Sequence, residues 1–212
     1  MSALAPYAAV FDDGLAALGL DLPAATRARL LAFGELLLKW NRVYNLTAIR
    51  RPQEVVTHHL LDSLAVLPHL AAVNRLADIG SGGGLPGIPL AIARAGLAVS
   101  SVETVNKKAS FQQQAKIELG LNNFQALNVR VENLKPEQGF DGVISRAFSS
   151  LKDFVDLAGH LVADGGALYA MKGVRPDDEL AALPAGWTLR ALHALTVPGL
   201  DAERHLLVIG RA

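Results

Sequence analysis

The segment 78–87 of the 212-residue chain reads Asp-Ile-Gly-Ser-Gly-Gly-Gly-Leu-Pro-Gly. It follows a short apolar run at 76–79 and precedes a longer apolar stretch at 86–95, so we expect it to join a β-strand to an α-helix. Glycines permit positive φ angles and let the backbone come close to a ligand, at an entropic cost that a plain turn would not require. The segment therefore predicts a cofactor-binding loop at the end of a strand.

The glycine spacing fits two kinds of cofactor loop. Residues 82–87 match the dinucleotide pattern, which alone is a weak signal. The frame 78–84 instead places Asp78 directly before the glycines, as in the first motif of class I methyltransferases, where the acid orients the loop and helps to hold the cationic methionine end of S-adenosylmethionine. Glu103 ends the next predicted strand, where an acid accepts hydrogen bonds from ribose hydroxyls in both folds. The frame that places Asp78 before the glycines favours S-adenosylmethionine over a dinucleotide. The length of the chain, which allows a single sheet domain, favours the same cofactor.

Strands and helices alternate on the carboxyl side of this loop. We expect strands at 76–79, 98–103, 124–129, 141–145, 167–171, 187–197 and 205–209, and helices at 86–95, 106–119 and 151–162. Such alternation predicts a parallel sheet, and the short Pro198-Gly199 turn predicts that the last two strands are antiparallel. The predicted fold is α/β and Rossmann-like, with a seven-stranded, mostly parallel sheet whose last strand is antiparallel.

The residues before the sheet are rich in Ala and Leu and read as helical. We expect helices at 8–20, 23–40 and 52–67, with a polar connection at 41–51. The second helix carries one apolar stripe, formed by Leu30, Phe33, Leu37 and Trp40. A change of hydrophobic period near Val73 predicts an N-terminal helical extension over residues 1–72, packed on a methyltransferase domain over residues 73–212.

Composition limits the possible functions. Hydrophobic residues make up 51% of the chain, and 20 Lys and Arg balance 20 Asp and Glu, so overall positive charge is not the source of any affinity for nucleic acid. The absence of cysteine excludes disulfides, thiolate metal sites and cysteine nucleophiles. We expect a cytoplasmic monomer without a secretory signal, a membrane span or a metal site. His58 and His59 point apart on a helix, and we expect His59 and Asp62 to make a surface or packing contact.

Further motifs occur in the order of one known family. They are Lys-Trp-Asn-Arg-Val-Tyr-Asn-Leu-Thr at 39–47, His-Leu-Leu-Asp-Ser-Leu at 59–64, Leu-Pro-Gly-Ile-Pro at 85–89, Ile-Ser-Arg-Ala-Phe at 144–148, Lys-Gly at 172–173 and Glu-Arg-His at 203–205. Nearly the whole chain resembles the bacterial glucose-inhibited division protein B family, also called ribosomal RNA small-subunit methyltransferase G. The resemblance implies transfer of a methyl group from S-adenosylmethionine to N7 of one guanine in the 530 loop of 16S rRNA, guanine 527 in the family's usual naming. The sequence leaves open whether the substrate is the free RNA or a small-subunit particle.

The resemblance also implies which residues bind the cofactor. The family's contacts carry over to Gly80, Leu85, Val131, Glu132 and Arg146, beside Asp78, Gly82, Gly84 and Glu103 from the loop itself. Two positions depart from the family pattern. Glu103-Thr104 stands where Asp-Ser is common, and Asn106-Lys107-Lys108 stands where Gly-Lys-Arg is common. Glu is one methylene longer than Asp, which leaves room for a shifted ribose contact.

Guanine N7 carries a lone pair and no proton, so its methylation needs alignment and no general base. Neither an Asn-Pro-Pro-aromatic nor an Asp-Pro-Pro-aromatic motif, which serve attack by exocyclic amines, follows the fourth predicted strand. We expect Arg146 to be the catalytic residue, which orients the guanine through O6 or holds a phosphate or the cofactor carboxylate. The alternative for Arg146 is a structural ion pair. Phe148 either stacks on a base or packs in the core.

A basic segment with interleaved aromatic residues precedes the sheet. Lys39, Arg42, Arg50 and Arg51 fall within thirteen positions that contain no acid. They predict an RNA phosphate surface, which Lys172 and Arg175 after the fifth strand would extend at the edge of the glycine loop. The alternative is a solvated face, with Trp40 in the core. Two other functions remain open at this stage: a small nicotinamide-dependent reductase and a methyltransferase fold without activity.

Overall fold

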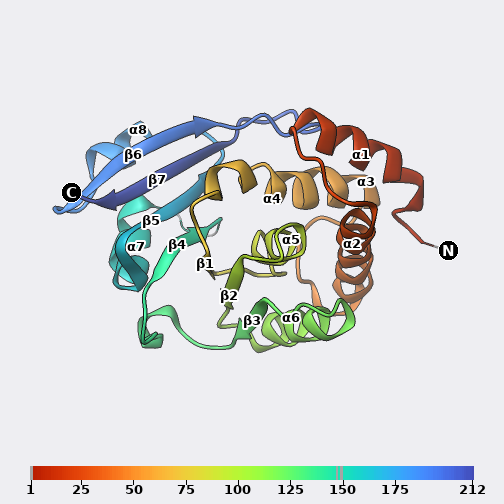
Figure 1. Ribbon diagram of the computed structural model, residues 1–212, viewed down its shortest axis with the longest axis horizontal. Coiled ribbons are helices and arrows are strands. Elements are labelled where there is room, and N and C mark those ends of the chain that lie inside the picture. The colour runs from red at the N-terminus through yellow and green to blue at the C-terminus, as the bar shows by residue number, and fades with distance from the viewer. Residues whose placement is uncertain (1, 147, 149) are drawn as a thin grey trace.

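The computed structural model describes residues 2–146, 148 and 150–212, and within them the chain forms a seven-stranded sheet (Figure 1). The strands are β1 (Arg75–Ile79), β2 (Ala98–Val102), β3 (Phe124–Leu127), β4 (Phe140–Ser145), β5 (Val162–Lys172), β6 (Trp187–Ala194) and β7 (His205–Arg211). Their order is β3-β2-β1-β4-β5-β7-β6, in which β1 to β5 are parallel and β7 is antiparallel to both of its neighbours. The predicted fold class is confirmed. Ala147 of the Ile-Ser-Arg-Ala-Phe motif lies outside the described residues, as do Met1 and Ser149.

Helices cover both faces of this sheet. The N-terminal helices are α1 (Ala8–Ala17), α2 (Ala24–Tyr44), α3 (Pro52–Glu54) and α4 (Asp62–Leu64), with a π-helical segment at Val55–Leu61 between the last two. The others are α5 (Gly87–Ala93), α6 (Asn106–Glu118), α7 (Leu151–Ala158) and α8 (Asp177–Ala181). Short 3-10 turns lie at Ala5–Tyr7, Leu67–Leu70, Val131–Asn133 and Gly159–Leu161. Helix α7 lies on the opposite face of the sheet from α5 and α6 (Figure 1).

Several boundaries differ from the sequence-based expectation. Helix α2 continues to Tyr44 and ends where Asn45 adopts a left-handed conformation with φ 50°, so the first part of the expected polar connection, 41–44, is helical. Strand β5 starts at Val162, before the expected start at 167, and includes Gly165 and Gly166. A register shift between Phe140 and Gly142 of the paired strand accommodates them as an irregularity within the sheet. Helix α8 has no counterpart in the expected elements.

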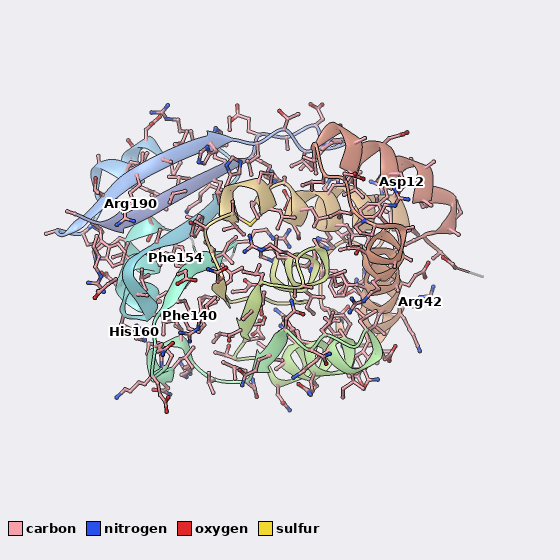
Figure 2. All side chains as sticks on the ribbon, viewed as in Figure 1. Asp12, Arg42, Phe140, Phe154, His160 and Arg190 are labelled. Carbon is pink, nitrogen blue, oxygen red and sulfur yellow. The ribbon has the colours of Figure 1, made fainter. Side chains whose placement is uncertain are left out.

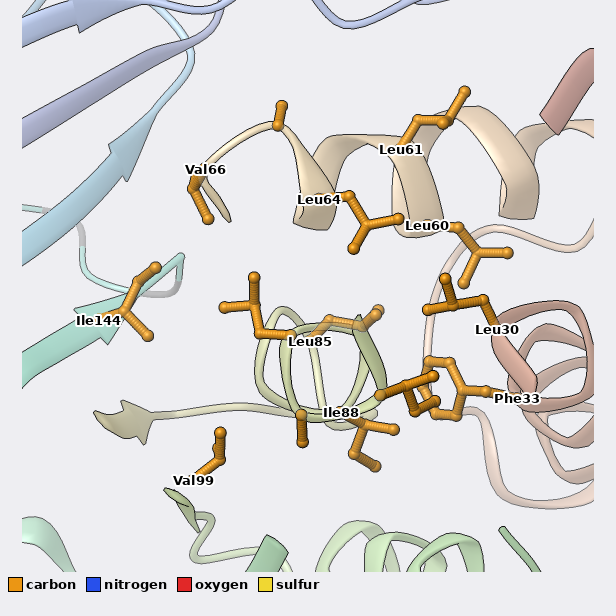
Figure 3. Packing of buried hydrophobic residues seen from close by; sticks show 14 of the residues in the cluster. Leu30, Phe33, Leu60, Leu61, Leu64, Val66, Leu85, Ile88, Val99 and Ile144 are labelled. Carbon is orange, nitrogen blue, oxygen red and sulfur yellow. The ribbon is translucent and has the colours of Figure 1, made fainter. Parts of the chain in front are cut away.

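One hydrophobic cluster joins the N-terminal helices to the sheet. Leu30 and Phe33 of α2 are fully buried, and Figure 3 shows them facing Ile88 of α5. The Phe33 ring lies 6.2 Å from the ring of Phe111 on α6, and Leu64 of α4 belongs to the same cluster. A second cluster fills the other face, beneath α7. This shared core supports a helical extension packed on the sheet, while the division at residue 72 stays a prediction.

We expect the substitution Phe33→Ala to destabilise the whole chain, because its ring fills a fully buried site between α2 and α6. The free energy of unfolding should fall by about 3–5 kcal/mol. Urea denaturation followed by the fluorescence of Trp40 on α2 and Trp187 on β6 measures this change. Val43→Ala on the exposed side of the same helix is the matched control, with an expected change within about 0.5 kcal/mol. Separate transitions for the two tryptophans would contradict a common core.

Candidate functional site

The glycine loop leaves β1 at the carboxyl edge of the parallel strands. Gly80, Gly82 and Gly84 have φ angles of 67°, 57° and 78°, a region that favours glycine. A Cβ atom on Gly84 would lie 2.4 Å from Cδ1 of Ile88, whereas a Cβ atom on Gly82 would meet nothing within 4 Å. Gly84 therefore serves the packing of α5, and the backbone at Gly82 faces open space that a ligand can enter.

Asp78 lies beneath the loop and is fully buried. Its Oδ2 accepts a hydrogen bond of 2.8 Å from the backbone N–H of Gly87, which fixes the start of α5. Its Oδ1 has no hydrogen-bond partner among the described residues, an uncommon state for a buried oxygen. Burial raises the pKa of Asp78 to about 7, against the opposing effects of the Gly87 hydrogen bond and the positive charge of Arg146. Asp78 thus orients the loop and keeps one acceptor unsatisfied.

Glu103 closes the loop from the side of β2. Its Oε2 accepts from the N–H of Gly82 and its Oε1 from the N–H of Val105, each at 2.8 Å. Gln112 of α6 holds the other side, because its Nε2 donates to Ser81 Oγ and to Gly82 O, both at 2.8 Å. The sequence analysis missed Gln112, and its only signal is a polar residue on the buried face of a helix.

The other predicted cofactor residues occupy different surroundings. Val131 is buried in the second cluster, while Glu132 beside it is exposed on the 3-10 turn that follows β3. The side chain of Leu85 packs in the first cluster (Figure 3), so only its backbone remains available to a ligand. The structure therefore brings the glycine loop, Glu103 and Arg146 to one edge of the sheet.

Arg146 follows β4 and faces the N-terminal helices. Its Nη1 donates to Oδ2 of Asp62 at 2.9 Å and to the backbone oxygen of His58 at 3.3 Å. The second oxygen of Asp62, Oδ1, accepts from Nε of Arg204 at 2.9 Å. The structural ion pair considered for Arg146 is therefore present, and it includes Arg204, which the sequence analysis did not select. Asp62 makes a packing contact as expected, but with these two arginines.

A cavity of about 440 Å³ opens beside this ion-pair cluster. Thr47, His59, Asp62, Arg146, Met171 and Arg204 are among its lining residues. Burial and the charge of Arg146 lower the pKa of His59 to about 3, so this histidine is neutral. Its Nδ1 lies 3.1 Å from a carbonyl oxygen and must carry the proton, so Nε2 accepts from the Thr47 hydroxyl at 2.8 Å. Both ring nitrogens are engaged, and His59 is part of the cavity wall.

The predicted RNA-binding residues of the first basic segment are exposed. Lys39 and Arg42 lie on α2, and Arg42 extends from its outer side (Figure 2). Arg50 donates to Oδ1 of Asn45 at 2.9 Å, and Arg51 forms an ion pair with Glu54. Trp40 is half-buried, and its ring lies 5.6 Å from that of Phe111, which agrees with a position at the margin of the core.

The residues after β4 and β5 have partners within the protein. Lys172 is only 13% exposed and pairs with Glu179 at 2.9 Å, and the exposed Arg175 pairs with Asp177 at 2.6 Å. The ring of Phe148 stacks on that of Phe154 at a centroid distance of 4.9 Å. These residues do not extend a continuous surface of unpaired positive charge.

Metal-binding clusters and membrane-spanning helices are both absent from the described part of the chain. No group of three or more His, Asp or Glu side chains in residues 2–146, 148 and 150–212 is placed to hold a metal ion. No helix within those residues is long and apolar enough to cross a membrane.

The buried Asp78 predicts a specific pH dependence of stability. The folded protein keeps the Asp78 proton up to about pH 7, whereas the unfolded chain loses it near 3.8, so the unfolded state binds fewer protons between these values. Wild-type stability relative to Asp78→Asn should therefore fall from about pH 4 to pH 7, by about 4 kcal/mol in total, and stay constant above. Urea unfolding of both proteins across this range measures the difference. Parallel stability curves would contradict the raised pKa.

Comparison with known proteins identifies the family. A family model described as rRNA small subunit methyltransferase G matches residues 26–207. The protein named ribosomal RNA small subunit methyltransferase G in Azoarcus sp. (strain BH72) is 83% identical over 211 residues, with 100% of both chains covered. Its namesake in Aromatoleum aromaticum is 66% identical over 208 residues, covering 96% of this chain and 99% of its own.

Solved structures with low identity share the fold. An O-methyltransferase from Bacillus cereus in complex with SAH superposes with a TM-score of 0.58 at 19% identity, over 85% of this chain and 91% of that chain. TrmN from Thermus thermophilus gives a TM-score of 0.56 at 20% identity, over 74% of this chain and 53% of that chain. The structural matches show the fold, and the sequence matches show that the chain belongs to the rRNA small subunit methyltransferase G family.

Proposed function

We propose that the protein transfers a methyl group from S-adenosylmethionine to N7 of a guanine in the 530 loop of 16S rRNA, in the free RNA or in a small-subunit particle. One observation carries the proposal: the glycine loop and the Arg146 cavity lie at the same edge of the sheet. Arg146 lines the cavity, and it directly follows β4, whose end pairs with the end of β1 just before the loop. Family membership supports small-subunit rRNA as the substrate. We also propose a cytoplasmic monomer.

The residues of the loop fit S-adenosylmethionine. The open side of Gly82 allows a ligand to approach the backbone, and the unsatisfied Oδ1 of Asp78 is suited to the cationic methionine end. Glu103 bonds one backbone N–H with each carboxylate oxygen, and each oxygen keeps a further lone pair for a ribose hydroxyl. Val131 and Glu132 would hold the adenine edge, as the family resemblance implies. The bound cofactor supplies a methyl group on a sulfonium, which is electrophilic.

Methylation at N7 requires the protein to orient the guanine and does not require it to remove a proton. Nη1 of Arg146 is engaged by Asp62 and His58, but Nε and Nη2 have no hydrogen-bond partner among the described residues. Arginine usually contacts guanine through O6 and N7 together. N7 must keep its lone pair for attack on the methyl group, so a contact to O6 alone fits the reaction. This is the catalytic role that we propose for Arg146.

The exposed basic residues are the proposed RNA-binding surface. Lys39, Arg42 and Arg50 have no acidic partner among the described residues and can meet phosphates, and Arg51 can do so once it leaves Glu54. Lys172 and Arg175 are weaker candidates because Glu179 and Asp177 already balance their charges. Phe148 packs against the second cluster through Phe154, and the exposed part of its ring is the proposed platform for a base.

The substitution Glu103→Gln tests the cofactor site. Glutamine keeps the size of the side chain, but its amide nitrogen would face a backbone N–H where the carboxylate now accepts a bond. We expect the dissociation constant for S-adenosylhomocysteine to rise about tenfold or more, since a hydrogen bond to a charged group contributes about 1.5–3 kcal/mol. Calorimetric titration measures it, with Glu118→Gln on the exposed face of α6 as control. Wild-type affinity in the Glu103 variant would refute the assignment.

The substitution Arg146→Ala tests the catalytic role. With tritiated S-adenosylmethionine and small-subunit rRNA, wild-type enzyme should label a single guanine in a single-turnover assay. Arg146→Ala should slow transfer by about 100-fold or more at saturating RNA, because one well-oriented contact in an active site is worth about 3 kcal/mol. Arg146→Lys should recover little of the rate, since lysine lacks the planar fork that contacts Asp62 and O6 together. Transfer by Arg146→Ala at the wild-type rate would remove Arg146 from the active site.

A further inference from the structure

We propose that Asp62 is a positioning residue for methyl transfer, whose carboxylate holds Arg146 and Arg204 together as a clamp for the target guanine. The proposal rests on the proposed function. Its starting point is the sharing of one buried acid by two arginines that line the same cavity.

Each carboxylate oxygen of Asp62 pairs with one of these two arginines. Asp62 is 2% exposed, and its two oxygens accept from Arg146 Nη1 and Arg204 Nε, each at 2.9 Å. Two guanidinium groups gathered at one place repel each other, and an acid between them offsets that repulsion. The acid balances one of the two positive charges, so the cluster as a whole stays cationic. Charge-assisted bonds of this kind also restrict the orientation of both side chains.

The clamp joins three segments that are far apart in the sequence. Asp62 follows the π-helical segment Val55–Leu61, Arg146 follows β4, and Arg204 precedes β7. The sequence separations from Asp62 are 84 residues to Arg146 and 142 residues to Arg204. π-Helical turns often occur at functional sites. Here the backbone oxygen of His58, within that segment, also accepts from Arg146. Asp62 therefore sets the distance between the N-terminal helices and the sheet edge at the cavity.

The exposure of the cluster is asymmetric. The acid is buried, whereas the side chains of Arg146 and Arg204 remain 30% and 25% exposed and line the cavity. Arg204 also donates from Nη1 to the backbone oxygen of Glu203, and its Nη2 has no hydrogen-bond partner in the described part of the chain. A pair that served only to join segments would not need free N–H groups facing an open cavity.

The free groups of the clamp are donors only, which suits guanine. Guanine presents the O6 acceptor at the position where adenine presents the N6 amino group, a donor. A cationic clamp would donate to O6 of guanine and would be disfavoured next to the N6 amino group of adenine. Because Asp62 engages part of each guanidinium, it limits which N–H groups reach the base and leaves N7 uncovered. Asp62 thereby acts on the reaction through Arg146 and Arg204, without touching the base.

The experiment compares Asp62→Asn and Asp62→Glu with wild type in single-turnover methylation of small-subunit rRNA, at saturating RNA and S-adenosylmethionine. Asp62→Asn should slow transfer at least tenfold, because an amide carries no charge and turns one oxygen into a donor that opposes an arginine. Its dissociation constant for S-adenosylhomocysteine should stay within about threefold of wild type, since the glycine loop is held by other residues. Asp62→Glu keeps both acceptors and should recover part of the rate.

Asp141→Asn is the matched control. Asp141 on β4 is also a carboxylate with two donors, but its Oδ2 accepts from the N–H groups of Asn74 and Arg75 at the amino end of β1, away from the glycine loop. This variant should lose stability and keep the wild-type rate per folded molecule. If Asp62→Asn does not fold, Arg204→Gln leaves Asp62 paired with Arg146 and should still slow transfer at least tenfold.

The outcomes separate the clamp from the proposed function. Wild-type transfer at a guanine, together with an unchanged saturating rate in Asp62→Asn or Arg204→Gln, would overturn the clamp alone. A rate loss that only follows the unfolded fraction, as in Asp141→Asn, would also overturn it. Failure of the wild type to methylate small-subunit rRNA would overturn the proposed function and the clamp with it.

Discussion

The hydrogen bond from the N–H of Gly82 to the carboxylate of Glu103 fixes the glycine loop to the end of β2, and the site is organised around that loop. Asp78 holds the far end of the same loop through Gly87, where α5 begins. Helix α5 packs against α2 in the common core, so the loop and the N-terminal helices are placed by one set of contacts. The cavity that those helices form with the sheet edge is consequently positioned relative to the cofactor loop.

Local sequence features predicted the loop and the sheet well. The run from β1 through the glycines to α5 depends on short-range patterns of apolar and glycine residues, and these were sufficient for the mostly parallel sheet and for placing Asp78 and Glu103 where strands end. The ends of elements were less predictable, because the irregularity in β5 depends on its pairing with β4. The Asp62 cluster could not be predicted, since its members pair only when three distant segments meet. The pairing of Lys172 with Glu179 is local in sequence, and it was not foreseen because helix α8, which carries Glu179, has no counterpart among the expected elements.

Arg146 connects the two halves of the site electrostatically. Burial raises the pKa of Asp78 beneath the loop and lowers that of His59 in the cavity wall. The charge of Arg146 acts in the lowering direction on both, while Asp62 holds its guanidinium in place. The cavity contains a neutral histidine whose nitrogens are both engaged, and its exposed polar groups include cationic donors. Such an environment suits a nucleophile that already has a lone pair, and it contrasts with sites that must remove a proton before attack.

The most direct test of the account is the mapping of N7-methylguanine in small-subunit rRNA from cells with this gene, without it, and complemented with the wild-type gene or with Arg146→Ala. N7-methylated guanines can be located by chemical cleavage of the RNA chain at the modified base. The account predicts one cleavage site in the 530 loop that disappears with the gene, returns with the wild-type copy and stays absent with Arg146→Ala. An unchanged cleavage pattern in cells that lack the gene would contradict it.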